Sequence, residues 1–361
     1  MQTLDLVNLD YLGFSSSFAA QFAELQRPDL VPARIAADGQ SVWQLAGSRA
    51  ALGELSGKLR HGLAHEQRPA VGDWVAVADS DDRAIIHHIL PRRTALVRRA
   101  ASLDAVSQVI AANVDLFGIV TSANQDLNPR RIERYLAAVW ESGASPMIVL
   151  NKVDLVDDVA PLRALLDEVA LAVPVVEVSA VTGDGLADLR AALAPGRTVA
   201  FIGSSGVGKS SLVNRLLGSE VQHVSDIRHD DARGRHTTTR RELRILPAGA
   251  VLIDTPGMRE LGLTEDAGGV ETAFADISEF AEACRFNDCR HEGEPGCAVQ
   301  EALYDGTLST ERWESYRKLQ REVAAYEARQ DPVLAAERRR QWKMITKSVR
   351  HSSKVTGKPL C

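Results

Sequence analysis

A glycine-rich string holds the residues with the clearest chemistry. It follows an apolar segment, 199–202, and runs directly into an amphipathic segment that carries Leu212 and Leu216. The string consists of Gly203, Ser204, Ser205, Gly206, Val207, Gly208, Lys209, Ser210 and Ser211. This is the pattern of a P-loop, in which glycines let successive backbone N–H groups point at phosphate oxygens. We expect Lys209 to reach the β- and γ-phosphates and the Ser210 hydroxyl to bind Mg²⁺.

A second set of residues predicts selectivity for guanine. Asn151-Lys152-Val153-Asp154 follows one apolar segment, and Ser179-Ala180 follows the next. A carboxylate at this place can accept hydrogen bonds from N1–H and from the 2-amino group of guanine, and adenine has no such pair of donors. We therefore expect Asp154 to select guanine, and Ser179 and Ala180 to support the base beside the P-loop.

A third motif, Asp254-Thr255-Pro256-Gly257, ends another apolar segment. We expect Asp254 to hold Mg²⁺, through water, and the Gly257 N–H to sense the γ-phosphate. The preceding segment, 225–241, is polar and basic without apolar periodicity, which is typical of a switch loop. From it we expect Thr238 to close over Mg²⁺, with the neighbouring Thr237 and Thr239 as alternatives.

The order of these motifs is unusual. Ordinary GTPases place the P-loop first, then the switch threonine, D-x-x-G, N-K-x-D and S-A, whereas here 151–154 and 179–180 come before the P-loop. This order indicates a circular permutation, which keeps the same sheet when the original termini are close. The chain would then leave the domain just after Gly257, so a downstream domain could respond directly to the nucleotide.

Three of the four cysteines are clustered with a histidine. Cys284, Cys289, His291 and Cys297 supply three thiolates and one imidazole within fourteen residues. Four such ligands complete a tetrahedral zinc site, and a site closed by protein ligands is structural. A disulfide or unreacted thiols are the alternatives, and Cys361 lies outside the pattern.

Around these motifs the sequence predicts a multidomain α/β protein. After an extension, 1–30, the short strand-like runs of 31–99 indicate a small β-barrel, with an OB-fold preferred to an SH3-like barrel. Strands and helices then alternate over 100–266, which is typical of a mainly parallel sheet with helices on both faces. Residues 267–361 are mostly helical and include the cysteine cluster.

Composition and charge limit the class of protein. The chain has 361 residues, 45% hydrophobic and 25% charged, and a net charge of −6, typical of an ordinary globular protein. The sequence has no apolar stretch long enough for a transmembrane helix, and its first residues do not resemble a secretory signal.

From Arg338 onward there are eight Lys or Arg and no Asp or Glu, which favours RNA binding over a solvated helix face.

The barrel carries two tryptophans and several arginines for which two interpretations are equally good. They could bind nucleic acid, or the tryptophans could belong to the core and the arginines to a solvated face. These are Trp43, Trp74, Arg92, Arg93, Arg98 and Arg99. The sequence alone leaves both interpretations open.

The chain resembles the ribosome-small-subunit-dependent GTPase A (RsgA or YjeQ) family. The resemblance lies in the barrel, in the permuted motifs 151–154, 203–211, 234–239 and 254–257, and in the cysteine cluster. The resemblance implies a circularly permuted P-loop GTPase domain between an OB-like barrel and a mostly helical zinc-binding domain. It further implies a cytoplasmic bacterial enzyme that binds the 30S subunit and its rRNA late in maturation and is stimulated by that subunit. The expected ligands are GTP or GDP with Mg²⁺ and one structural Zn²⁺; we expect a monomer and no membrane partner.

The hydrolytic group is the hardest to assign. Many GTPases have a water-orienting glutamine after D-x-x-G, but here the residue is Met258, whose thioether cannot orient water. Slow intrinsic turnover is therefore expected, with His236 as the catalytic candidate that the resemblance supports; contact of His236 with RNA is the alternative.

Two rival functions remain: a GTPase acting on a tRNA or the large subunit, and an RNA-binding assembly protein for which nucleotide is only a ligand.

Overall fold

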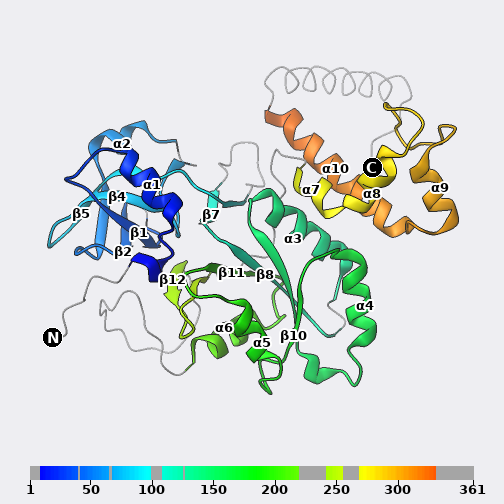
Figure 1. The fold of residues 1–361 in the computed structure, drawn as a ribbon, viewed down its shortest axis with the longest axis horizontal. Helices are drawn as coiled ribbons and strands as arrows, with labels where there is room; N and C mark the ends of the chain where they lie inside the picture. Colours follow the sequence, from blue (N-terminus) through cyan, green and yellow to red (C-terminus); the bar gives the residue numbers. More distant parts are fainter. Residues whose placement is uncertain are drawn as a thin grey trace, which may run out of the picture. The chain divides into compact units, whose positions relative to one another are not determined.

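The computed structural model of the chain describes residues 9–39, 41–64, 67–98, 108–124, 127–218, 241–254 and 268–330. These residues fall into two compact units, which divide after Ser278. The first unit contains a small barrel and a larger α/β sheet, and the second contains most of the helical C-terminal part (Figure 1). The predicted basic tail from Arg338 lies outside the described residues.

Five strands close the N-terminal barrel. They are β1 (Val31–Ala37), β2 (Val42–Ala46), β3 (Leu52–Leu55), β4 (Trp74–Ala78) and β5 (Ala84–Ile89). Their order is β1-β2-β3-β5-β4, and β1 pairs again with β4 to close the ring. The helix α2 (Gly57–Gly62) connects β3 to β4, and β3 is parallel to β5. This five-stranded Greek-key barrel confirms the expected OB-like fold.

The barrel tryptophans belong to its core. Trp43 is 2% exposed and Trp74 is fully buried, so neither ring can stack on a nucleic-acid base. Arg92 makes an ion pair with buried Asp73 at 2.7 Å, and Arg93 pairs with Asp115 at 2.9 Å. Of the two open interpretations, the structure therefore supports the core for both tryptophans; Arg99 lies outside the described residues.

The N-terminal extension covers the barrel. It forms a 3₁₀ turn, η1 (Leu9–Leu12), and the helix α1 (Ser16–Glu24). The rings of Phe14 and Phe18 lie 4.7 and 6.0 Å from that of Trp74. These aromatic contacts give the extension a packing role that the sequence did not reveal.

A polar cluster joins the barrel to the sheet that follows. Arg34 of β1 is buried, and its guanidinium donates to Thr198 Oγ1 at 2.9 Å and to the carbonyl oxygens of Leu12, Gly72 and Asn113. Burial lowers the pKa of Arg34 to about 10, a shift that leaves the guanidinium charged at neutral pH. Because Thr198 begins the strand that leads to the P-loop, this cluster connects the barrel to the nucleotide domain. A separate hairpin, β6 (Ala95–Arg98) with β7 (Gln108–Ala112), connects the two parts along the chain.

Six strands form the larger sheet. They are β8 (Leu116–Ser122), β9 (Ser145–Asn151), β10 (Val175–Val178), β11 (Thr198–Ile202), β12 (Glu242–Ile245) and β13 (Val251–Asp254). Their order is β10-β9-β8-β11-β13-β12, with all neighbours parallel except β12–β13. β12 also pairs with β1 at Glu242 and Ala37, so these strands continue into those of the barrel. The mainly parallel sheet predicted from the alternating pattern is confirmed.

Helices cover both faces of this sheet (Figure 1). They are α3 (Pro129–Glu141), α4 (Ala160–Val169), α5 (Leu186–Ala192) and α6 (Lys209–Leu217), with a short 3₁₀ turn, η3 (Val153–Leu155), after β9. Leucines of α5 and α6 share one apolar cluster with Val149, Val199 and Phe201 of the strands. α3 and α4 lie on the opposite face.

Within 268–330, the part of the C-terminal region that the structure describes, four helices follow the sheet. They are α7 (Gly268–Ala273), α8 (Ala275–Glu282), α9 (Ala298–Asp305) and α10 (Thr310–Gln330). These helices confirm the mostly helical character predicted for this part of the chain. The loop between α8 and α9 carries the cysteine and histidine cluster.

Candidate nucleotide site and metal centre

The glycine-rich string forms a tight loop between β11 and α6. Gly203 and Gly208 have φ values of +146° and +95°, which residues with a side chain rarely adopt. A Cβ on Gly208 would lie 2.3 Å from Asn151 Nδ2, so any side chain at this position would clash with Asn151. Lys209 Nζ donates to the carbonyl oxygens of Gly203 and Ser204 at 2.7 and 2.6 Å. The lysine thus closes the loop over the first turn of α6, where N–H groups accumulate.

Asn151 holds the loops of β9, β10 and β11 together. It is buried at the carboxyl end of β9, and its Nδ2 donates to the carbonyl oxygen of Val207 at 2.8 Å. Its Oδ1 accepts from the Ala180 N–H at 3.1 Å. Lys152, in the left-handed conformation, places its Nζ 2.6 Å from the Gly206 carbonyl oxygen. Two residues of the predicted guanine motif therefore contact the P-loop directly.

Asp154 is positioned by Ser179. The Ser179 hydroxyl donates to Asp154 Oδ1 at 2.5 Å and accepts from the N–H groups of Val181 and Thr182. This arrangement fixes Oδ1 of Asp154, and within the described residues no hydrogen bond to Oδ2 is present. Two motifs 25 positions apart meet here because β9 and β10 are parallel neighbours.

Asp254 ends β13, two strands from β8 and directly beside β11. The pKa of its carboxyl group is raised above the ordinary value. Burial is the main cause and the Glu242 carboxylate adds to it, while the Arg244 guanidinium acts in the opposite direction. A partly buried carboxylate of this kind is a suitable ligand for a divalent cation. Ser210, the other predicted Mg²⁺ ligand in the described residues, lies exposed in the first turn of α6. Of the remaining predicted site residues, Val153 lies in η3 and Ser211 lies in α6. Thr238, His236 and Gly257 lie outside the described residues.

Two arginines that the motifs do not include contact this site. Arg215, in the last turn of α6, donates from Nε to the Ala180 carbonyl oxygen at 2.8 Å and from Nη2 to that of Val181 at 2.6 Å. Arg131, in the first turn of α3, donates to Ser204 Oγ at 2.5 Å. Their partners are backbone or hydroxyl oxygens brought close by the fold, so no spacing in the sequence could have indicated them.

The predicted metal ligands converge in the second unit. The ligand atoms of Cys284, Cys289, His291 and Cys297 all lie within 4.8 Å of one another. Cys284 Sγ is 3.9 Å from Cys297 Sγ, and His291 Nδ1 lies 3.5 and 3.4 Å from these two sulfurs. A tetrahedral zinc site requires separations of about 3.8 Å between sulfurs and about 3.6 Å between sulfur and nitrogen. The sulfurs are too far apart for a disulfide bond of about 2.05 Å.

The thiols of the cluster differ in their electrostatic surroundings. Burial and the two neighbouring thiols raise the pKa of Cys289, whereas hydrogen bonds from the backbone N–H groups of Val299 and Ala298 outweigh burial and lower the pKa of Cys284. The Glu294 carboxylate organises the ligand loop by accepting from the N–H groups of Arg290, Glu292 and Gly293. These hydrogen bonds lower the pKa of Glu294 to about 2.

The strand order and the motif order together define a circularly permuted P-loop GTPase. A family model described as RsgA GTPase matches residues 89–264, and one described as 50S ribosome-binding GTPase matches residues 198–335. The chain is 45% identical to the small ribosomal subunit biogenesis GTPase RsgA of Opitutus terrae, over 98% of this chain and 100% of that one. It is 44% identical to the protein of the same name from Syntrophotalea carbinolica, over 94% and 96% of the two chains. The chain belongs to the RsgA GTPase family.

Two solved structures share the fold. YjeQ from Thermotoga maritima is 28% identical, with a TM-score of 0.60 over 82% of this chain and 99% of that chain. YloQ, described as a circularly permuted GTPase, is 25% identical, with a TM-score of 0.60 over 83% and 96% of the two chains. Within the part of the chain that the structure describes, no helix combines the length and apolar character needed to cross a bilayer.

Proposed function

We propose that the protein hydrolyses GTP to GDP and phosphate while it acts on the small ribosomal subunit. The observation that carries this proposal is the meeting of the P-loop, 151–154, 179–180 and Asp254 at the carboxyl ends of neighbouring parallel strands. Ligands of open α/β sheets bind at this edge. The names of the full-length relatives support the ribosomal assignment.

In this proposal the P-loop residues bind the phosphates and the NKVD motif binds the base. Lys209 exchanges the carbonyl oxygens of Gly203 and Ser204 for phosphate oxygens, since its ammonium now donates to those carbonyls. The free oxygen of the Asp154 carboxylate accepts from guanine, and Ala180 supports the base. Ser210, Asp254 and Thr238 would hold Mg²⁺, which neutralises charge on the β- and γ-phosphates.

For hydrolysis, water attacks the γ-phosphorus, and the bond to the bridging oxygen of GDP breaks. Gly257 contributes its N–H to the γ-phosphate, and His236 orients the water, since Met258 cannot accept its proton. Slow turnover of the protein alone is the expected consequence.

The remaining assignments extend the same proposal. The basic tail from Arg338 binds rRNA, the metal of the cysteine cluster is zinc, and the protein works as a cytoplasmic monomer. The functional domains are proposed as a barrel over 31–99, a GTPase domain over 100–266 and a zinc-binding domain over 267–361. The Cys₃His donor set fits zinc because soft thiolates combined with an imidazole are typical structural zinc ligands.

The experiment is GTP hydrolysis by the purified protein alone, with 30S particles and with 50S particles, at low and high salt. We expect strong stimulation by 30S particles that declines with salt, because phosphate contacts by a basic segment are screened. Equal activity with and without 30S particles would contradict the ribosomal assignment. Stimulation by 50S particles alone would favour the second candidate, a large-subunit GTPase, which the description of the second family model suggests.

A further inference from the structure

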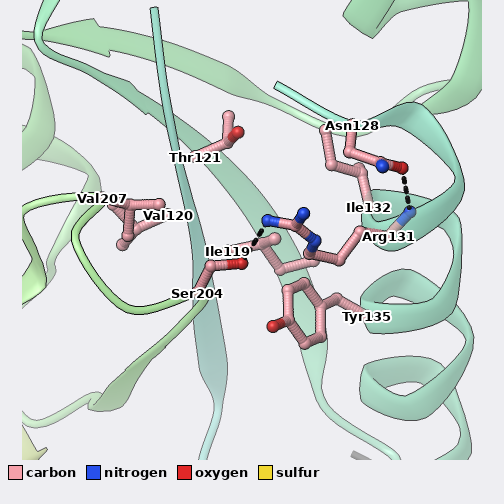
Figure 2. A pocket seen from close by; sticks show the side chains of 9 residues that line it. All are labelled: Ile119, Val120, Thr121, Asn128, Arg131, Ile132, Tyr135, Ser204 and Val207. Carbon is pink, nitrogen blue, oxygen red and sulfur yellow. Dashed lines mark hydrogen bonds between the residues drawn. The ribbon is translucent and has the colours of Figure 1, made fainter. Parts of the chain in front are cut away.

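Besides Asn151 and Lys152, a side chain of α3 also contacts the P-loop. Figure 2 shows the Arg131 side chain extending from α3 toward Ser204, with Ile132 and Tyr135 of the same helix nearby. The guanidinium Nη1 donates to Ser204 Oγ at 2.5 Å, across 73 positions of sequence. Both side chains are half-buried, so the hydrogen bond is partly shielded from water.

The helix start fixes the position of this arginine. Asn128 caps α3, and its Oδ1 accepts from the Arg131 N–H at 3.1 Å. Ile132 and Tyr135, one and four residues later, are buried in the core and hold the first turn against β8. The guanidinium is therefore delivered to the P-loop from a rigid element.

The space around the contact leaves no room for a ligand. The cavity lined by Arg131, Tyr135, Thr121, Ser204 and Val207 has a free volume of about 10 Å³, which corresponds to about one water molecule. The role of the arginine is thus to hold the loop rather than to form a separate binding site.

Ser204 is held at two atoms by two cations. Its carbonyl oxygen accepts from Lys209 Nζ at 2.6 Å, and its hydroxyl accepts from Arg131. In the proposed function Lys209 leaves that carbonyl when a phosphate arrives. The Arg131 hydrogen bond uses a different atom, so it can persist in both states and keep the loop in a phosphate-binding shape.

We propose that Arg131 is a positioning residue for nucleotide binding that acts through the Ser204 hydroxyl. This inference rests on the proposed function, because it assumes that the loop binds a nucleotide. Preorganising a loop lowers the ordering cost of binding, and a charged donor makes a stronger hydrogen bond than a neutral one.

The test is a double-mutant cycle on the full-length protein, with the GDP dissociation rate and the melting temperature as readouts. The variants are Arg131→Ala, Ser204→Ala, the double variant and Arg131→Lys. The matched control is Arg163→Ala, since Arg163 is a partly exposed arginine of α4 that pairs with Asp167 on its own helix and with Glu177 of β10, away from the P-loop.

We expect each single alanine variant to accelerate GDP dissociation about tenfold and the double variant to add nothing further. Arg131→Lys should recover most of the loss, and melting temperatures should stay at the value of the control. Additive effects, an unchanged rate in either single variant, or no recovery with lysine would overturn the inference. Failure of the unmodified protein to bind GDP would instead overturn the proposed function.

Discussion

Arg215 shows how a single side chain outside the motifs can shape the base-binding loop. Its guanidinium connects the P-loop helix to two successive carbonyl oxygens, those of Ala180 and Val181. Those carbonyls point toward α6, so the N–H groups of the same loop face Ser179 and Asn151. The arginine therefore orients the loop that is proposed to receive guanine.

Arg215→Ala should weaken GDP binding about tenfold, because two charge-assisted hydrogen bonds to the loop are lost. The effect should be expressed in the dissociation constant, with little change in the melting temperature. Equilibrium titration with a fluorescent GDP analogue measures it, with the exposed Arg197→Ala as control. An unchanged dissociation constant would show that the loop holds its shape without Arg215.

The residues that could be predicted from the sequence are those whose type is dictated by a ligand. Lys209, Asn151 and Asp154 fall in fixed strings because phosphate and guanine demand particular groups at particular spacings. The roles of Arg131 and Arg215 could not be predicted, since their partners are a hydroxyl and carbonyls that only the folded sheet brings near. The metal ligands were predictable because all four lie in one short segment.

At the scale of elements, α3 and α7 pack unusually closely. A Cβ on Gly269 would lie 2.3 Å from the Ala137 carbonyl oxygen and 2.8 Å from Glu141 Cβ, whereas one on Gly268 would meet nothing within 4 Å. α7 is the first described element after Asp254, and α3 also carries Arg131. The close approach fixes α7 against α3, the helix that contacts the P-loop.

The two glycines of α7 predict opposite responses to alanine. Gly269→Ala should destabilise the protein by roughly 1–3 kcal/mol, because α7 must move away from the α3 backbone. Gly268→Ala should be neutral or stabilise by up to about 1 kcal/mol, since alanine favours helix. Chemical denaturation of both variants measures the difference, and equal effects would contradict the packing.

Elements were predictable where their hydrophobic pattern was continuous. The strands around β8, β9 and β10 and the helices α3 to α5 follow the predicted alternation within a few residues. β3 has a weak pattern because its four residues include Gly53, and a side chain at that position would clash with Leu45, since a Cβ there would lie 2.7 Å from Leu45 Cδ1. The pairing of β6 with β7 has no clear sequence signal, because no turn signal lies close to either strand.

At the scale of the whole molecule, the nucleotide site and the metal centre lie in different compact units. The cysteine and histidine loop has few buried apolar side chains beyond Cys297 and Val299, so we expect its fold to depend on a bound metal. The P-loop contacts described above, from Arg131, Asn151, Lys152 and Lys209, all lie within the first unit. Loss of the metal is therefore expected to affect the two units differently.

Cys297→Ser, or removal of the metal by a chelator, should unfold the metal loop while GDP binding is retained. The reason is that the ligand set loses a thiolate or the ion, and the sheet edge keeps all of its hydrogen bonds. Limited proteolysis with and without chelator, together with GDP titration and metal analysis for zinc, measures both effects. Simultaneous loss of GDP binding would indicate that the two units do not fold independently.

The most direct test of the central claim is nucleotide selectivity measured by competition of GTP and ATP for hydrolysis, in the unmodified protein and in Asp154→Ala. The motifs brought together at the carboxyl edge of the sheet predict that GTP is hydrolysed and ATP is not, and that Asp154→Ala loses this discrimination. Equal hydrolysis of ATP by the unmodified protein would contradict the assignment of a guanine site to this edge.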